Sequence, residues 1–242
     1  MAIPVAAIPI VKEPVLQCVT CTHTGTTLPE GGFDKLASVL VGRGENTKEF
    51  QVHRGVLVQS STSFQQTLAN AKPREKMKLP FESPETFETV VYWLYSNRFW
   101  SPTSATDSKI PLSYEQILAV YYCADEHGMQ ALQNATLTLF YQKLAEEWKA
   151  PTTQLSKIYG NTAAGSPLRK LVVDFMAQTW SFDLDLNSHM LPHGFLIDVL
   201  NMLRDLGKAP GSGVNKQKWF AEMNESFCGR YHDHGERVSD KS

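Results

Sequence analysis

Hydrophobic residues near the start of the chain follow a period of two, and this spacing predicts a β-hairpin. Val39 and Val41 lie two residues apart, and Phe50 and Val52 repeat that spacing after a polar stretch at residues 42–47. A period of two places alternate side chains on one face of a strand, and a polar connection of this kind is typical of a turn. We therefore expect two paired strands between residues 36 and 53.

From His53 and Arg54 onward the hydrophobic residues follow helical spacing, so the second strand is expected to lead directly into a helix. We interpret His53 as a structural residue that hydrogen-bonds backbone groups at this junction, in preference to a general base or a metal ligand. Val56, Leu57 and Phe64 should pack behind it. The full set of residues that marks the junction is Phe50, Val52, His53, Arg54, Val56, Leu57 and Phe64.

A short strand and a capped helix follow the junction. Met77 and Leu79 alternate with lysines, which predicts a half-exposed strand. Ser83 and Pro84 then have the residue types preferred at the N-cap and the first helical position. Helical spacing predicts that one face of this helix is buried. The residues of that face are Phe87, Val90, Val91, Leu94 and Tyr95.

Two further helices with a short connection predict a helical hairpin. Ser113 and Gln116 have the spacing of a capping box, and Gly128 is placed to end the first helix. A second helix should run from residue 129 to about residue 149. It presents one stripe of Leu132, Ala135 and Leu139 and a neighbouring stripe of Phe140, Leu144 and Trp148.

The remaining chain is predicted to be helical, with apolar faces at residues 155–159, 168–176 and 195–206 and a last short segment at residues 219–227. The fold class is α/β of the α+β kind, a small sheet capped by helices with an all-helical C-terminal extension. We predict a disordered tail at 1–32, a core at 33–104, the helical hairpin at 111–149, the helical extension at 150–206, and a flexible linker and tail at 207–242.

Charge and composition exclude several classes of partner. The net charge is −2, with 23 basic and 25 acidic residues and no dense basic run, so a nucleic acid is not expected. Residues 1–17 are apolar but lack a basic region and are too short to span a bilayer, so neither a signal nor a membrane segment is expected. Four cysteines in a chain of 242 residues are too few for a disulfide scaffold, which favours the cytosol or nucleus.

Candidate chemistry is sparse. No nucleophile motif of the GxSxG type occurs, and Gly42 and Gly44 lie between two strands, where a turn is expected rather than a phosphate loop. We therefore expect neither catalysis nor a cofactor. The alternative is a zinc-binding protein, because cysteine and histidine are the ligands that zinc prefers. Its ligands would be Cys18 and Cys21, with His23 nearby, together with Cys228, His232 and His234.

The order of elements and several spaced strings resemble the BTB/POZ domain. The strings are Phe50 to Leu57, Ser60-Ser61 with Phe64, Leu79-Pro80, Ser83 to Phe87 and Trp93-Leu94-Tyr95. The resemblance implies a protein–protein interaction module, acting as an adaptor or scaffold, in which the helices after Pro151 contact a partner. Strings nearer the C-terminus are similar to those of BTB proteins from filamentous fungi, namely Ile158-Tyr159, Gly165 to Arg169 and Cys228 to His234.

The resemblance implies two kinds of partner, a second copy of the chain and a cullin-type ubiquitin ligase scaffold. The chain departs from the sequence features that are associated with each of them. Homodimerising members often carry an extra N-terminal helix, whereas residues 1–32 are rich in Pro and Gly, and Ser38 stands where many members have Asp. Members that bind a cullin-type ubiquitin ligase scaffold often show an apolar-x-Glu signature, which residues 72–75 match poorly. A DNA-binding regulator is the third alternative, but the chain contains no basic domain or finger repeat.

Overall fold

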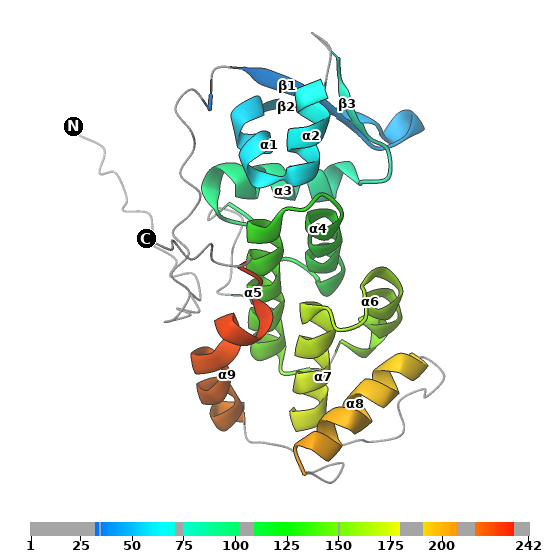
Figure 1. The fold of residues 1–242 in the computed structure, drawn as a ribbon, viewed down its shortest axis with the longest axis vertical. Coiled ribbons are helices and arrows are strands. Elements are labelled where there is room, and N and C mark those ends of the chain that lie inside the picture. Colours follow the sequence, from blue (N-terminus) through cyan, green and yellow to red (C-terminus); the bar gives the residue numbers. More distant parts are fainter. Residues whose placement is uncertain are drawn as a thin grey trace, which may run out of the picture.

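The computed structural model describes residues 32–33, 35–70, 75–101, 109–149, 151–179, 191–207 and 216–234. These residues form an elongated body with a small sheet at one end, a pair of helices in the middle and four further helices at the other end (Figure 1). The predicted tail lies outside the described residues, apart from Gly32. Within the described ranges, every helix is too short or too polar to cross a membrane.

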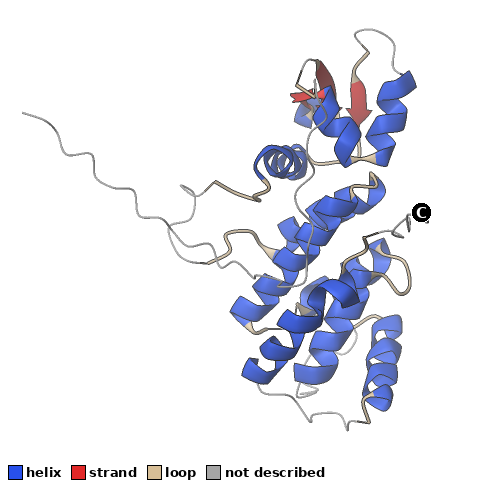
Figure 2. Cartoon of the chain, turned by 60° about the vertical axis from the view of Figure 1, so that its left-hand side comes forward, coloured by secondary structure: helices blue, strands red, loops and turns tan. Residues whose placement is uncertain are grey.

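The predicted hairpin and short strand form one three-stranded sheet. Strand β1 (Leu36–Val41) pairs antiparallel with β2 (Lys48–His53) and parallel with β3 (Met77–Leu79), in the order β2-β1-β3. The turn between β1 and β2 contains a short 3-10 helix, η1 (Gly44–Asn46). The sheet lies at one end of the body, and helices account for most of the remaining described residues (Figure 2). The predicted α+β class is therefore confirmed.

The helix expected after β2 is present but divided in two. Helix α1 (Arg54–Ser60) and helix α2 (Thr62–Asn70) meet at Ser61, whose backbone is extended. The Ser61 hydroxyl accepts a hydrogen bond from the Phe64 amide (3.0 Å) and donates one to the His127 carbonyl (2.5 Å). The serine thus caps α2 and links it to a residue far along the chain, which the local pattern could not indicate.

Helix α3 (Pro84–Ser96) has the predicted start, but its buried face is rotated. The Ser83 hydroxyl accepts a hydrogen bond from the Thr86 amide (3.0 Å), as expected for an N-cap. Phe87, Val90 and Trp93 are buried, whereas Val91 and Leu94 are only half-buried and Tyr95 is exposed. The predicted face was wrong at Tyr95 and omitted Trp93, whereas Val91 and Leu94 still pack against the core that contains the sheet.

The helical hairpin is formed by α4 (Tyr114–Glu126) and α5 (Gln130–Glu147), and both predicted signals at its ends are present. Ser113 and Gln116 make the reciprocal bonds of a capping box. Gly128 has φ of +62°, and a Cβ there would lie 2.3 Å from the Thr62 hydroxyl oxygen. Glycine is therefore required both by the left-handed backbone and by the close approach of α2.

The hairpin contributes to two separate hydrophobic cores. One core contains the sheet and α1–α3, and the hairpin adds Val120, Cys123, Ala124, Met129 and Leu132 to it. The other core contains the C-terminal helices, and residues from the same two helices reach it from the opposite side. The two stripes predicted on α5 match this division in part. Leu132 belongs to the first core and Phe140 and Leu144 to the second, but Leu139, which was predicted on the stripe of Leu132, lies in the second core.

The second core is built by the C-terminal helices. These are a short 3-10 helix η3 (Thr152–Gln154), α6 (Leu155–Asn161), α7 (Pro167–Thr179), α8 (His193–Asp205) and α9 (Lys216–Tyr231). Helix α7 lies between α8 and α9 in Figure 1, and every residue from Leu171 to Gln178 is buried.

Helix α9 contradicts the prediction of a flexible tail for residues 216–234. Trp219, Met223, Phe227 and Tyr231 are buried at intervals of four, so one face of the helix joins the second core. Trp219 has no exposed surface, and its ring lies 5.3 Å from the Phe175 ring of α7. The flexible linker expected at 208–215 lies outside the described residues.

Replacing Trp219 by Ala should lower the free energy of unfolding by about 3–5 kcal/mol, because it leaves a cavity in the second core. Urea denaturation followed by circular dichroism measures this change. Phe81→Ala is the control, because 77% of Phe81 is exposed and its removal should change stability by less than about 0.5 kcal/mol. An equally small effect of Trp219→Ala would show that α9 is not part of the core.

Candidate functional site

The junction of β2 and α1 is held by contacts from three different segments. His53 donates its backbone N–H to the Tyr95 hydroxyl (2.9 Å), and its Nδ1 lies 2.7 Å from the same oxygen. Arg54 donates its backbone N–H to the Lys35 carbonyl (2.7 Å) and its guanidinium to the Leu68 carbonyl (2.8 Å). The junction therefore connects α1 to α3, to α2 and to the start of β1.

The backbone contact that the sequence suggested for His53 is made instead by the neighbouring Arg54. His53 does not cap α1 with its side chain, and its Nδ1 meets a tyrosine hydroxyl rather than a backbone group. Arg54 is the residue whose side chain bonds a backbone carbonyl. The interpretation of His53 as a partner of backbone groups was wrong, because Tyr95 on α3 brings a polar atom to the junction from 42 residues away.

The apolar residues of the predicted junction set are mostly buried, and Val52, Leu57 and Phe64 belong to the first core. Val52, Val56, Leu57 and Phe64 are each at most 2% exposed. Phe50 is half-buried, with its ring 5.1 Å from that of Phe87. The four buried residues can stabilise the fold, but they offer no surface to a ligand or partner.

A second polar cluster, which the sequence did not suggest, joins the sheet to the hairpin. It consists of Glu82, Cys123 and His127, whose potential ligand atoms lie within 4.8 Å of one another. His127 Nε2 and a Glu82 carboxylate oxygen are 3.2 Å apart, and both side chains are nearly buried. Burial raises the pKa of the Cys123 thiol, and the Glu82 carboxylate adds to this effect. The thiol is thus kept protonated, which makes it a poor nucleophile.

Three of the predicted zinc ligands come together at the end of α9. The potential ligand atoms of Cys228, His232 and His234 lie within 4.8 Å of one another. Cys228 Sγ and His234 Nε2 are 3.1 Å apart. Cys18 and Cys21, the other half of the predicted site, lie outside the described residues.

A comparison with known protein families bears on residues 37–144. Residues 37–144, which contain the sheet, α1–α3 and nearly all of the hairpin, match the model of the BTB/POZ domain. These residues form a BTB/POZ domain. No curated protein matches the chain significantly. BTB/POZ domains are generally protein–protein interaction modules rather than enzymes, so the function suggested by the fold is binding.

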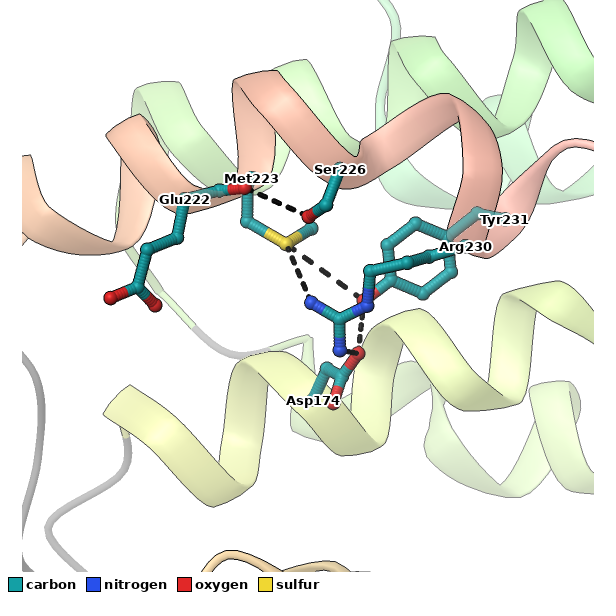
Figure 3. Close-up of polar contacts among 6 residues, drawn as sticks. All are labelled: Asp174, Glu222, Met223, Ser226, Arg230 and Tyr231. Carbon is teal, nitrogen blue, oxygen red and sulfur yellow. Dashed lines mark hydrogen bonds and ion pairs between the residues drawn. The ribbon is translucent and has the colours of Figure 1, made fainter.

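The C-terminal helices beyond the BTB/POZ domain are fixed by a buried acid on α7. Asp174 is 2% exposed, and its Oδ2 accepts hydrogen bonds from the Tyr231 hydroxyl and from the Arg230 guanidinium, the latter at 2.6 Å (Figure 3). Oδ1 of Asp174 is buried and has no hydrogen-bond partner. The sequence offered no signal for this contact, because Arg230 and Tyr231 lie 56 and 57 residues from Asp174 along the chain.

Burial raises the pKa of the Asp174 carboxyl above its ordinary value, although Tyr231 and Arg230 act in the opposite direction. An acid whose pKa is raised by folding contributes its full stability below its unfolded pKa, which is about 4. That contribution is lost as the pH rises through the raised pKa, because the folded protein must then ionise a buried group.

The variant Asp174→Asn keeps an oxygen acceptor but cannot ionise. Its free energy of unfolding should therefore increase relative to wild type as the pH rises from about 4 to about 7. Urea denaturation of both proteins across this range measures the difference. Asp205→Asn is the control, because Asp205 pairs with Arg204 on the exposed surface and should show a small effect. A relative stability that falls with pH would show that the Asp174 pKa is lowered.

Proposed function

We propose that the protein is a non-catalytic adaptor or scaffold that holds two protein partners. The observation that carries this proposal is the BTB/POZ domain at residues 37–144, since domains of this family generally bind proteins. The domain continues into a helical region that shares the hairpin with it. A partner bound by the C-terminal helices would therefore be held at a fixed distance from one bound by the sheet end.

Exposed apolar side chains at both ends of the body support two binding surfaces. At the sheet end, Phe33, Leu36 and Phe81 each expose more than half of their surface. At the other end, Ile197 and Leu200 of α8 are 44% and 58% exposed. Figure 1 places the sheet and α8 at opposite ends. Exposed apolar side chains that gather into a patch commonly mark a surface that a partner covers, and we propose one such surface at each end.

The known partners of BTB domains suggest what kind of partner binds at the sheet end. BTB domains commonly homodimerise or bind a cullin, and the two departures in sequence concern these interactions. Ser38 lies in β1, where its hydroxyl accepts a hydrogen bond from the Gln51 amide (2.6 Å), and residues 72–74 lie outside the described residues. We propose a protein partner here and a cytosolic or nuclear location, in keeping with Cys123 and Cys228, neither of which forms a disulfide among the described residues.

Charged substitutions at each end test the adaptor proposal. Partners captured from a native cell extract by the wild-type protein are compared by quantitative mass spectrometry with those captured by Phe81→Glu and by Ile197→Glu/Leu200→Glu. A desolvated apolar anchor contributes about 2 kcal/mol or more to binding, so each variant should lose one set of partners by at least about tenfold. The other set should remain.

Ala221→Glu is the matched control, because Ala221 is exposed on α9 and the change adds one charge outside both surfaces. It should retain both sets of partners. Light scattering on each protein shows whether a partner lost at the sheet end is a second copy of the chain. Capture that is unchanged by both variants, or capture of no reproducible partner, would contradict the adaptor proposal.

A further inference from the structure

The C-terminal end of α9 gathers one thiol and two imidazoles. Cys228 is buried, His232 is half-buried and His234 is exposed. Zinc binds thiolate sulfur at about 2.3 Å and imidazole nitrogen at about 2.0–2.1 Å, so tetrahedral ligands lie roughly 3.3–3.6 Å apart. The 3.1 Å between Cys228 Sγ and His234 Nε2 is a few tenths of an ångström below this spacing. A small movement of the exposed His234 ring would admit a cation.

Helix α5 holds the segment that carries the two histidines. The Asn134 amide donates a hydrogen bond to the Asp233 carbonyl (2.7 Å), and its oxygen accepts one from the Asp233 N–H (3.2 Å). Asn134 is 8% exposed, so these two bonds are largely shielded from water. Residues 232–234 are therefore positioned on the BTB/POZ hairpin by the protein itself, 99 residues away in sequence.

Thr138, one turn along α5, determines which nitrogen of His232 carries the proton. Its hydroxyl lies 2.9 Å from His232 Nε2 and also donates to the Asn134 carbonyl (3.0 Å). A hydroxyl has one proton to donate, so the oxygen of Thr138 accepts from Nε2–H. The lone pair of His232 is then on Nδ1. Histidines that bind metals commonly donate their other N–H to a fixed oxygen in this way.

From these contacts we infer that Cys228, His232 and His234 bind a zinc ion at the end of α9, beside the Asn134 and Thr138 side chains of α5. Binding converts the Cys228 thiol to a thiolate and releases its proton to solvent. Three protein ligands leave the fourth tetrahedral position for water or another donor. The Glu82, Cys123 and His127 cluster is the weaker candidate, because its carboxylate and imidazole already pair with each other in a nearly closed space.

Cobalt titration of the untagged full chain, after chelator treatment, tests this inference. Cobalt should bind at about one equivalent and give the absorption bands of a tetrahedral site with a sulfur ligand, and zinc should displace it. Cys228→Ser should abolish the sulfur-to-cobalt band. His234→Ala changes an exposed residue and should weaken binding by at least tenfold without disturbing the core. Thr138→Val should weaken it about 10–100-fold, as expected for a partner of a metal ligand.

The controls separate this site from the other thiols and histidines. His193→Ala removes an exposed histidine of α8, and Cys123→Ser removes the thiol of the other cluster; both should bind cobalt as the wild type does. Absence of a sulfur-to-cobalt band in wild type, or its persistence in Cys228→Ser, would overturn the inference.

Discussion

Burial of the α4–α5 hairpin between two hydrophobic cores is the constraint on which the structure depends. Val120 and Leu132 pack against the sheet and α1–α3, while Leu137 and Phe140 pack against the C-terminal helices. A helix that is apolar on several sides is stable only when it is covered on all of them. Each core therefore covers surface that the other leaves exposed, and the BTB/POZ domain depends on the helices that follow it.

The adaptor that we propose would bind its two partners at surfaces held apart by this arrangement. The sheet end and α8 lie at opposite ends of the body and are connected through packed helices rather than through a linker (Figure 1). Helix α9 adds to this connection, because Asp174 binds it to α7 and Asn134 binds the following segment to α5. In the adaptor that we propose, the separation of the two surfaces is set by these contacts.

Local signals in the sequence predicted the elements, but not the contacts between distant ones. The N-cap at Ser83 and the capping box at Ser113 were readable because their partners lie three residues away. The pairing of His53 with Tyr95 and the burial of Asp174 were not, since each depends on the packing of separate helices. The length of helix α9 was underestimated, because its apolar residues are separated by polar ones. The helix is stabilised by packing in the second core rather than by a strong local pattern.

Native-state hydrogen exchange, measured by mass spectrometry at increasing urea concentration, tests the shared hairpin most directly. If both cores depend on it, the slowest amides of α3, α5 and α7 should exchange with the same free energy of opening and the same dependence on urea. Amides of α7 that exchange at a free energy more than about 2 kcal/mol below those of α3 would show that the cores unfold independently. That result would contradict the account.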